Sequence, residues 1–327
     1  MTRFAKDMAL HVPVFVVIVA PLFLHNHRVT GYWLPSSFYS KLQRESVVGA
    51  LAMERVAPIF TAPAKQIWSL LVLWAKDNVL LVVPFLFGLG WLARSVFSPD
   101  SRHRSLLIPM LLVGQPIAWA LVAGYRDAGF QSQRYVAALN ALFLLLGVVG
   151  GTRLIERVRQ AQRNVALRAA LVVLVLGASL ARQPSAANIY ARNVKNITEM
   201  QVTIARWLRD KAPRGSLLAV NDVGAIGVIS GDPVLDLQGL VTPEALAPRA
   251  ESYRQFAAGQ APLALSEFVF ARRPHYLVIF PEWYPEMDAR RDLLTPVFGV
   301  QLKDNITCGK ALMVVYRTVW ARADEEP

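Results

Sequence analysis

The chain has 327 residues, a hydrophobic fraction of 54% and a formal net charge of +12. This composition is too apolar for a soluble globular protein and indicates an integral membrane protein. Residues 1–182 contain 19 Lys and Arg against 7 Asp and Glu, whereas residues 183–327 contain 16 of each kind. The basic residues flank apolar runs and do not form one face with interleaved aromatic residues, so no nucleic-acid partner is expected. The single cysteine, Cys308, excludes an intrachain disulfide.

Five apolar segments before residue 183 are predicted to cross a membrane. Several are shorter than the ~20 residues that span a bilayer, so their ends are expected to include neighbouring residues. The first follows the basic start "MTRFAK" and is not followed by a good small-residue cleavage site, which predicts a retained anchor. The segments are residues 8–24, 79–92, 105–123, 135–150 and 165–181.

The basic residues predict how these segments are oriented. Lys and Arg are retained on the cytoplasmic side of a membrane, which assigns residues 1–7, 93–104 and 151–164 to the cytoplasm. The outer loops are then residues 25–78 and 125–134. Five crossings from a cytoplasmic N-terminus place the C-terminal region outside the membrane.

Within the first outer loop, "ERVAPIFTAPAKQIWSLLVLWAKDN" carries Trp68 and Trp74 among leucines and valines. This pattern is typical of a helix that lies in the membrane interface with its indoles at headgroup depth. It is equally compatible with the start of a longer second span, and both interpretations stay open here.

The character of the sequence changes after residue 182. "RQPSAANIYARN" is interpreted as a linker, and "ITEMQVTIARWLRDK" as an amphipathic helix. The runs "SLLAV", "PVLDL", "PHYLVIF" and "KALMVVYRTV" predict strands, and "DVGAIGVIS" and "TPEALAPRAESYRQFAAG" predict a short helix or turn and a helix. The predicted fold is therefore an α-helical integral membrane region of about five spans, residues 1–182, followed by a small extracytoplasmic α/β domain, residues 183–327.

Three stretches resemble one family. "NHRVTGYWLPSSFYSK", residues 26–41, resembles the outer-loop pattern N…TG..LP.TFY.K of bacterial polyprenol-dependent membrane glycosyltransferases of the GT-C type. "QSQRYVAALNALFLLLG", residues 131–147, resembles the GRY-containing entry to one of their later membrane helices. "NDVGAIGVISGDPVLDLQGLVTPE", with "RPHYLVIFPEWYP" further on, is similar to the extracytoplasmic domain of arabinofuranosyl- and mannosyltransferase-like members.

The resemblance implies a bacterial inner-membrane protein of cell-envelope glycan or glycolipid assembly, with a polyprenyl-phosphate sugar as donor. Family members carry an acidic residue in their first long outer loop, commonly an Asp, whereas this loop has Glu45 and Glu54 and no Asp before Asp77. The chain therefore resembles the C-terminal half of such an enzyme. This departure suggests a second membrane subunit that carries the catalytic half, and leaves a non-catalytic, membrane-anchored binding or partner subunit as the alternative.

Residues near the outer membrane surface are the candidates for the donor site. Transfer from a polyprenyl phosphate needs a base for the acceptor hydroxyl and cationic help for the leaving phosphate, with a divalent cation as one option. Glu45 is the candidate base, although it also stands four residues from Lys41 on a charged helix. His25 and His27 lack an evident third metal ligand. The phosphate-binding candidates are Lys41, Arg134, Tyr39 and Tyr135, and Arg134 with Tyr135 also fits an interfacial anchor.

Asp222, Asp236 and Gly239 are the candidates for acceptor contact in the C-terminal domain. The two aspartates come at the ends of predicted parallel strands, at the edge where open α/β sheets bind ligands. An aspartate after a strand also caps helices and forms turns without any ligand. The nearby glycines do not form a dinucleotide-binding GxGxxG motif.

Overall fold

The computed structural model describes residues 3–41, 57–97, 107–123, 136–157, 165–181 and 183–321. The chain forms two compact units. The first consists of Met1–Pro21 and Lys41–Pro184, and the second of Leu22–Ser40 and Ser185–Pro327. The start of the predicted outer loop therefore belongs to the C-terminal unit.

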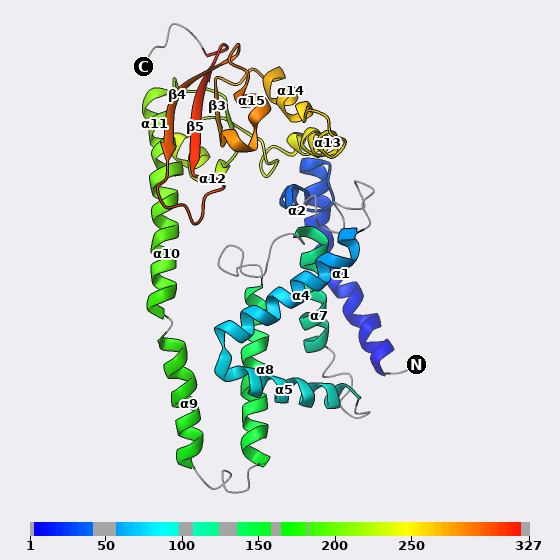
Figure 1. Cartoon of the computed structure of the whole chain (residues 1–327). Helices are drawn as coiled ribbons and strands as arrows, with labels where there is room; N and C mark the ends of the chain where they lie inside the picture. Colours follow the sequence, from blue (N-terminus) through cyan, green and yellow to red (C-terminus); the bar gives the residue numbers. More distant parts are fainter. Residues whose placement is uncertain are drawn as a thin grey trace. The chain divides into compact units, whose positions relative to one another are not determined.

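The first unit is helical (Figure 1). Apart from the helix Ala57–Asp77, its helices overlap the five apolar segments of the sequence. Among the described residues, three helices are long and apolar enough to cross a membrane: Pro13–Thr30, Val79–Val96 and Ala137–Arg157. Ile108–Trp119 is apolar but shorter. The five predicted spans are thus supported by length and composition in three cases. The helices are α1 (Arg3–Thr30), which belongs to the second unit from Leu22 onward, α4 (Ala57–Asp77), α5 (Val79–Phe97), α7 (Leu107–Ala123), α8 (Ala137–Arg157) and α9 (Val165–Leu180).

Helices α5 and α8 touch through their backbones. A Cβ built at Gly150 of α8 would overlap the carbonyl oxygen of Pro84 in α5, and one built at Gly88 would overlap the carbonyl oxygen of Leu146. Small residues allow apolar helices to approach this closely, which increases their van der Waals contact. The two glycines therefore determine how α5 packs on α8.

Helices α4 and α5 are separate, because Asn78 between them is not helical. Trp74 is 5% exposed, packs against Phe85 and Phe143, and donates its indole N–H to Asn140 of α8 over 2.8 Å. Trp74 therefore serves helix packing, and its depth in a membrane stays a prediction. Trp68 is 69% exposed and remains available for an interface.

The second unit contains a five-stranded mixed sheet with the order β2-β1-β3-β5-β4. Strands β1, β2 and β3 are parallel, and β5 and β4 extend the sheet in antiparallel fashion. The strands are β1 (Leu218–Val220), β2 (Val234–Asp236), β3 (Tyr276–Ile279), β4 (Leu294–Gln301) and β5 (Leu312–Thr318). The helices are α2 (Ser36–Lys41), α10 (Gln183–Ile197), α11 (Thr203–Lys211), α12 (Val223–Ser230), α13 (Leu246–Ala257), α14 (Leu263–Ala271) and α15 (Pro285–Asp288).

Helices cover both faces of this sheet (Figure 1). Leu208 of α11 and Ile226 of α12 are fully buried against one face, and Val269 of α14 and Met287 of α15 are fully buried against the other. The predicted small α/β domain is confirmed, because the short apolar runs form buried strands and the amphipathic runs cover them.

Two sequence interpretations of this unit need correction. The segment interpreted as a linker, residues 182–193, instead forms most of α10 from Gln183 onward, since Pro184 is tolerated in the first turn of a helix. Strand β4 was not predicted, because Pro296 and Gly299 weaken its strand pattern. A proline is tolerated there because β4 is an edge strand with an irregularity at Pro296/Phe298.

Gly150→Ala is expected to destabilise the first unit by about 1–3 kcal/mol, because the added methyl group forces α5 and α8 apart. The melting temperature of the full chain in detergent measures this effect. Gly114→Ala on α7 is the matched control: its Cβ meets no heavy atom within 4 Å, so it is expected to be neutral or slightly stabilising. Equal melting temperatures for the two variants would contradict the packing described above.

Candidate functional site

The carboxyl ends of β1 and β3 form the edge at which an open α/β sheet binds ligands. The chain leaves β1 through α12 on one face, reaches β2, and returns to β3 through α13 and α14 on the opposite face. The connections therefore diverge between β1 and β3. Asn221 directly follows β1, and Tyr284 follows β3 after a short 3-10 turn, Pro281–Trp283.

Three polar side chains form a closed hydrogen-bonded triangle at this edge. The Tyr284 hydroxyl donates to Asn221 Oδ1 over 2.5 Å. The Gln238 amide donates to the same oxygen and to the Tyr284 hydroxyl, and both of these hydrogen bonds are 2.8 Å long. Tyr284 is 7% exposed and Asn221 is 5% exposed. Burial raises the pKa of the Tyr284 phenol well above its usual range, while the nearby positive charge of Arg249 acts in the opposite direction. This phenol is therefore a neutral hydrogen-bonding group, not a base.

Asp236 organises the turn after β2. Its fully buried carboxylate accepts hydrogen bonds from the backbone N–H groups of Gln238, Leu240 and Val241. Gly239 has a φ of +74° within this turn, and a Cβ there would overlap the side chain of Leu246. Two of the three predicted acceptor-site residues, Asp236 and Gly239, thus form the turn. The Asp236 carboxylate is hydrogen-bonded to the backbone of this turn.

Asp222 lies at the same sheet edge but pairs differently. It occupies the position before α12 without capping that helix, and its Oδ2 accepts a hydrogen bond of 2.9 Å from Gln201. Gln201 belongs to a π-helical turn, Thr198–Val202, and also contacts the Cys308 sulfur at 3.4 Å. Burial raises the pKa of the Asp222 carboxyl, and the charge of Asp236 adds to this effect.

A segment from the beginning of the chain contacts this edge. Ser36 at the start of α2 donates to the carbonyl oxygen of Leu240 in the Asp236 turn, over 2.7 Å. Arg249 of α13 donates to the carbonyl oxygen of Ser40, also over 2.7 Å. The contact joins residues more than two hundred positions apart in the sequence, and both Ser40 and Arg249 are buried.

Arg249 is a buried cation without a described acidic partner. Its side chain donates to Ser40 and to the Tyr253 hydroxyl and lies 5.2 Å from the centre of the Tyr253 ring. Within the part of the chain that the structure describes, it forms no ion pair with Asp or Glu. A buried charge held only by neutral acceptors attracts anions, which makes the surroundings of Arg249 favourable for a phosphate or carboxylate.

The predicted donor-site residues are only partly described. Tyr39 is half-buried in α2, with its ring 4.6 Å from that of Tyr32. Lys41 ends α2, but its side chain is outside the described residues. Glu45, Arg134 and Tyr135 are also outside them, so these three assignments remain predictions.

The described residues do not offer a site for a divalent cation. His27 stacks on Trp33 at 4.2 Å, and its Nδ1 lies 3.1 Å from the carbonyl oxygen of Gly31. No group of three His, Cys, Asp or Glu side chains that could hold a metal ion occurs in residues 3–41, 57–97, 107–123, 136–157, 165–181 and 183–321.

The family comparison concerns the C-terminal unit. A family model described as a domain of unknown function, DUF8728, matches residues 189–320. This range starts within α10, contains all five strands, and ends two residues after β5. No curated protein and no solved structure matches the chain. The match therefore delimits a domain and assigns no activity to it.

Sequence reasoning missed four residues of this edge: Asn221, Gln238, Arg249 and Tyr284. Asn221 had a signal, because it directly follows a predicted strand beside Asp222. The other three come from a turn, a helix and a 3-10 connection that only the fold brings to β1. Their proximity depends on the strand order, which periodicity does not reveal.

Arg249→Gln is expected to destabilise the C-terminal unit by about 2–4 kcal/mol, because it removes a buried, charge-assisted contact with Ser40. Limited proteolysis of the full chain should then cut residues 22–40 faster. Arg254→Gln on the same helix is the control, since Arg254 is exposed and pairs only with Glu251. If both variants resist proteolysis equally, Arg249 does not hold residues 22–40 on the C-terminal unit.

Asp222→Asn is expected to raise stability progressively as the pH increases. Burial raises the folded-state pKa of Asp222, so the stability this group contributes is full below its unfolded pKa and is lost as the pH rises through the folded pKa. The asparagine still accepts from Gln201 but cannot ionise. Melting temperatures should therefore coincide near pH 3.5 and favour the variant near pH 7.

The control for this experiment is Asp210→Asn. Asp210 is exposed, and its hydrogen bond with Arg209 lowers its pKa, so its replacement should not increase stability toward pH 7. A constant difference between Asp222→Asn and the original chain across this pH range would show that burial of the Asp222 charge does not govern the effect.

Proposed function

We propose that this chain is a glycosyltransferase-type membrane protein of cell-envelope glycan or glycolipid assembly that recognises a polyprenyl-phosphate sugar. One observation carries the proposal. Two of the stretches that resemble the polyprenol-dependent glycosyltransferases, residues 26–41 and the turn after β2, are hydrogen-bonded to each other through Ser36 and Leu240. Spacing in the sequence does not require this contact, and it supports a binding site to which both stretches contribute.

The charge distribution around this contact suits a phosphate. Arg249 is buried and donates to the Ser40 carbonyl oxygen, without a described acidic partner. Asn26 at the start of the same stretch has a buried Nδ2 with no hydrogen-bond partner among the described residues. An unpaired buried donor is rare in folded proteins and is compatible with an acceptor oxygen supplied by a ligand.

The described residues favour recognition over proton transfer. Asp236 is fully buried and already accepts from three backbone N–H groups. Asp222 is paired with Gln201. Neither carboxylate is placed to deprotonate an acceptor hydroxyl, which requires a base within hydrogen-bonding reach of it. A non-catalytic, membrane-anchored binding or partner subunit, whose base comes from a second polypeptide, is therefore the second candidate function.

Lys41→Gln and Arg134→Gln are each expected to weaken binding of polyprenyl phosphate to the purified full chain about tenfold, because each removes one charge-assisted phosphate contact. Native mass spectrometry in detergent measures this affinity. Lys195→Gln is the matched control, since Lys195 is exposed on α10 and pairs with Glu199. Equal affinities for polyprenyl phosphate and uncharged polyprenol would rule out phosphate recognition.

A transfer assay separates the two candidate functions. Sugar transfer from a polyprenyl-phosphate donor by the purified chain, lost in Glu45→Gln, would assign the base to this chain. Donor binding without transfer, with transfer restored by a co-purifying polypeptide, would assign it to a partner.

A further inference from the structure

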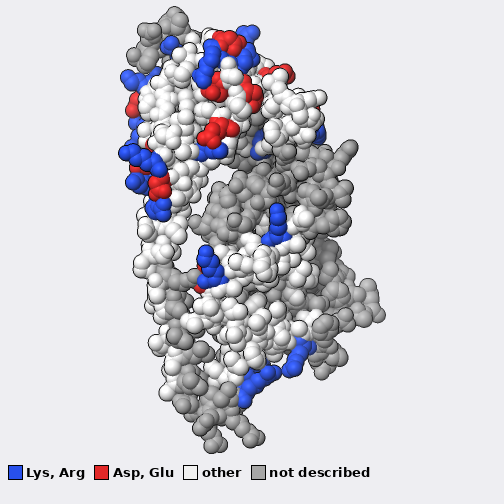
Figure 2. Space-filling view, viewed as in Figure 1, with Lys and Arg blue, Asp and Glu red and all other residues white. Residues whose placement is uncertain are grey.

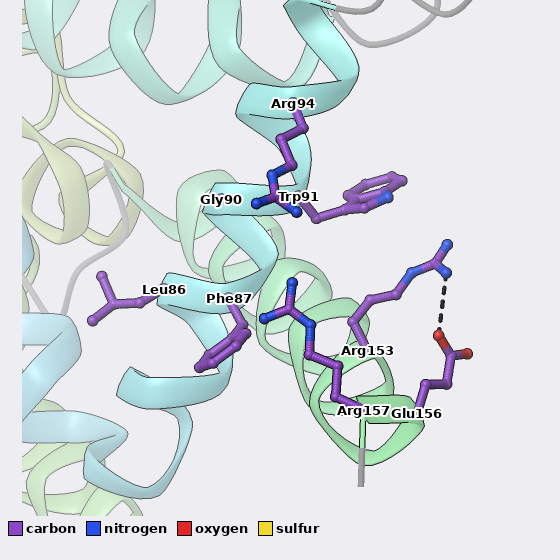
Figure 3. A pocket seen from close by; sticks show the side chains of 8 residues that line it. All are labelled: Leu86, Phe87, Gly90, Trp91, Arg94, Arg153, Glu156 and Arg157. Atoms are coloured by element: carbon purple, nitrogen blue, oxygen red, sulfur yellow. Dashed lines mark hydrogen bonds and ion pairs between the residues drawn. The ribbon is translucent and has the colours of Figure 1, made fainter. Parts of the chain in front are cut away.

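A groove lies between α5 and the last turn of α8, within the first unit (Figure 3). Its volume is about 510 Å³, which is in the range of small-molecule and headgroup sites. The α5 residues that line it fall at positions that share one helix face, because helix neighbours recur at spacings of three and four. The lining residues are Leu86, Phe87, Gly90, Trp91, Arg94, Arg153, Glu156 and Arg157.

The groove has an excess of positive charge. Arg153 forms a 3.1 Å ion pair with Glu156, the only acidic residue of the lining. Arg94 and Arg157 have no described ion pair with Asp or Glu anywhere in the part of the chain that the structure describes. Figure 3 shows their side chains extending into the groove from its opposite ends. Two guanidinium groups therefore remain available to an anion.

The floor of the groove is aromatic and aliphatic. The Arg157 guanidinium lies 5.4 Å from the centre of the Phe87 ring, and Arg153 lies 5.8 Å from that of Trp91. These contacts hold the arginines in place while leaving N–H groups free, because stacking on a ring uses the face of the guanidinium. A ligand with a charged head and an apolar body matches such a surface.

The groove occurs where α5 and α8 change from apolar to basic. Both helices are long and apolar enough to cross a membrane, and their basic residues lie near their C-terminal ends. Figure 2 shows one face of the molecule. The charged side chains of the first unit on this face are mostly basic, whereas those of the C-terminal unit are both basic and acidic. Arginines at the end of an apolar helix lie at headgroup depth.

We propose that this groove binds the phosphate diester of an anionic phospholipid in the adjoining leaflet. Arg94 and Arg157 hold the phosphate through charge-assisted hydrogen bonds, and Leu86, Phe87 and Trp91 contact the glycerol and the upper acyl chains. The site is separate from the sheet edge of the C-terminal unit and does not depend on the function proposed for that edge. It would anchor α5 and α8 at a defined depth in the membrane.

Native mass spectrometry of the full chain, with phosphatidylglycerol or phosphatidylcholine added in detergent, tests this proposal. Phosphatidylglycerol is expected to bind at least about tenfold more tightly than phosphatidylcholine. The double variant Arg94→Gln/Arg157→Gln should lose this preference. The control Arg209→Gln/Arg254→Gln removes the same charge from exposed positions of the C-terminal unit and should keep it.

Three results would overturn the proposal: equal affinity for the two lipids, an unchanged preference in the double variant, or complete displacement of the lipid by millimolar inorganic phosphate. The last result would identify a site for free phosphate. If the double variant does not fold, Arg94→Lys/Arg157→Lys replaces it. That variant retains both charges and should keep the preference for phosphatidylglycerol but weaken the binding, since lysine lacks the planar fork of arginine.

Discussion

The buried carboxylate of Asp236 is the interaction on which the carboxyl edge of the sheet in the C-terminal unit depends. It accepts three backbone hydrogen bonds and closes the turn after β2. That turn carries Gln238 to Asn221 and Tyr284, and it presents the Leu240 carbonyl to Ser36. A buried carboxylate is tolerated only when it is hydrogen-bonded, so the turn and the charge require each other. Gly239 is needed because its positive φ lets the turn close against Leu246.

Hydrogen bonds also hold the other polar side chains of this sheet edge. Asp236 accepts three backbone hydrogen bonds, Asp222 accepts one from Gln201, and burial raises the pKa of the Tyr284 phenol, so the described polar groups of this edge are held largely by one another. Arg249 adds a buried cation that donates to neutral acceptors, the Ser40 carbonyl oxygen and the Tyr253 hydroxyl. A buried cation without a carboxylate partner favours an anionic neighbour.

The helical unit is organised by close contact instead of by polar pairing. Gly88 and Gly150 bring the backbones of α5 and α8 together, and Trp74 joins α4 to this pair through Phe85, Phe143 and Asn140. Beyond the glycine contacts the helices leave a groove, because long side chains such as Arg94 and Arg157 replace small ones. The α5–α8 pair thus packs closely at its glycines and forms the proposed anion-binding groove beyond them. Part of the net positive charge of the first 182 residues lies in this groove.

The sequence by itself determined the membrane character of the chain, the α/β class of its C-terminal domain and most of its strands. These properties follow from local composition and periodicity, which "SLLAV", "PVLDL" and "PHYLVIF" display within a few residues. It also indicated that Asp222 and Asp236 share one sheet edge.

The helix formed by residues 183–193 and strand β4 were not predicted, because a proline early in a helix or in an edge strand resembles a break. Only the tertiary structure decided that residues 22–40 join the C-terminal unit, that Tyr284 and Gln238 meet Asn221 beside β1, and that α5 and α8 enclose a basic groove. Such contacts depend on strand order and helix packing between distant residues, and local sequence carries no record of them.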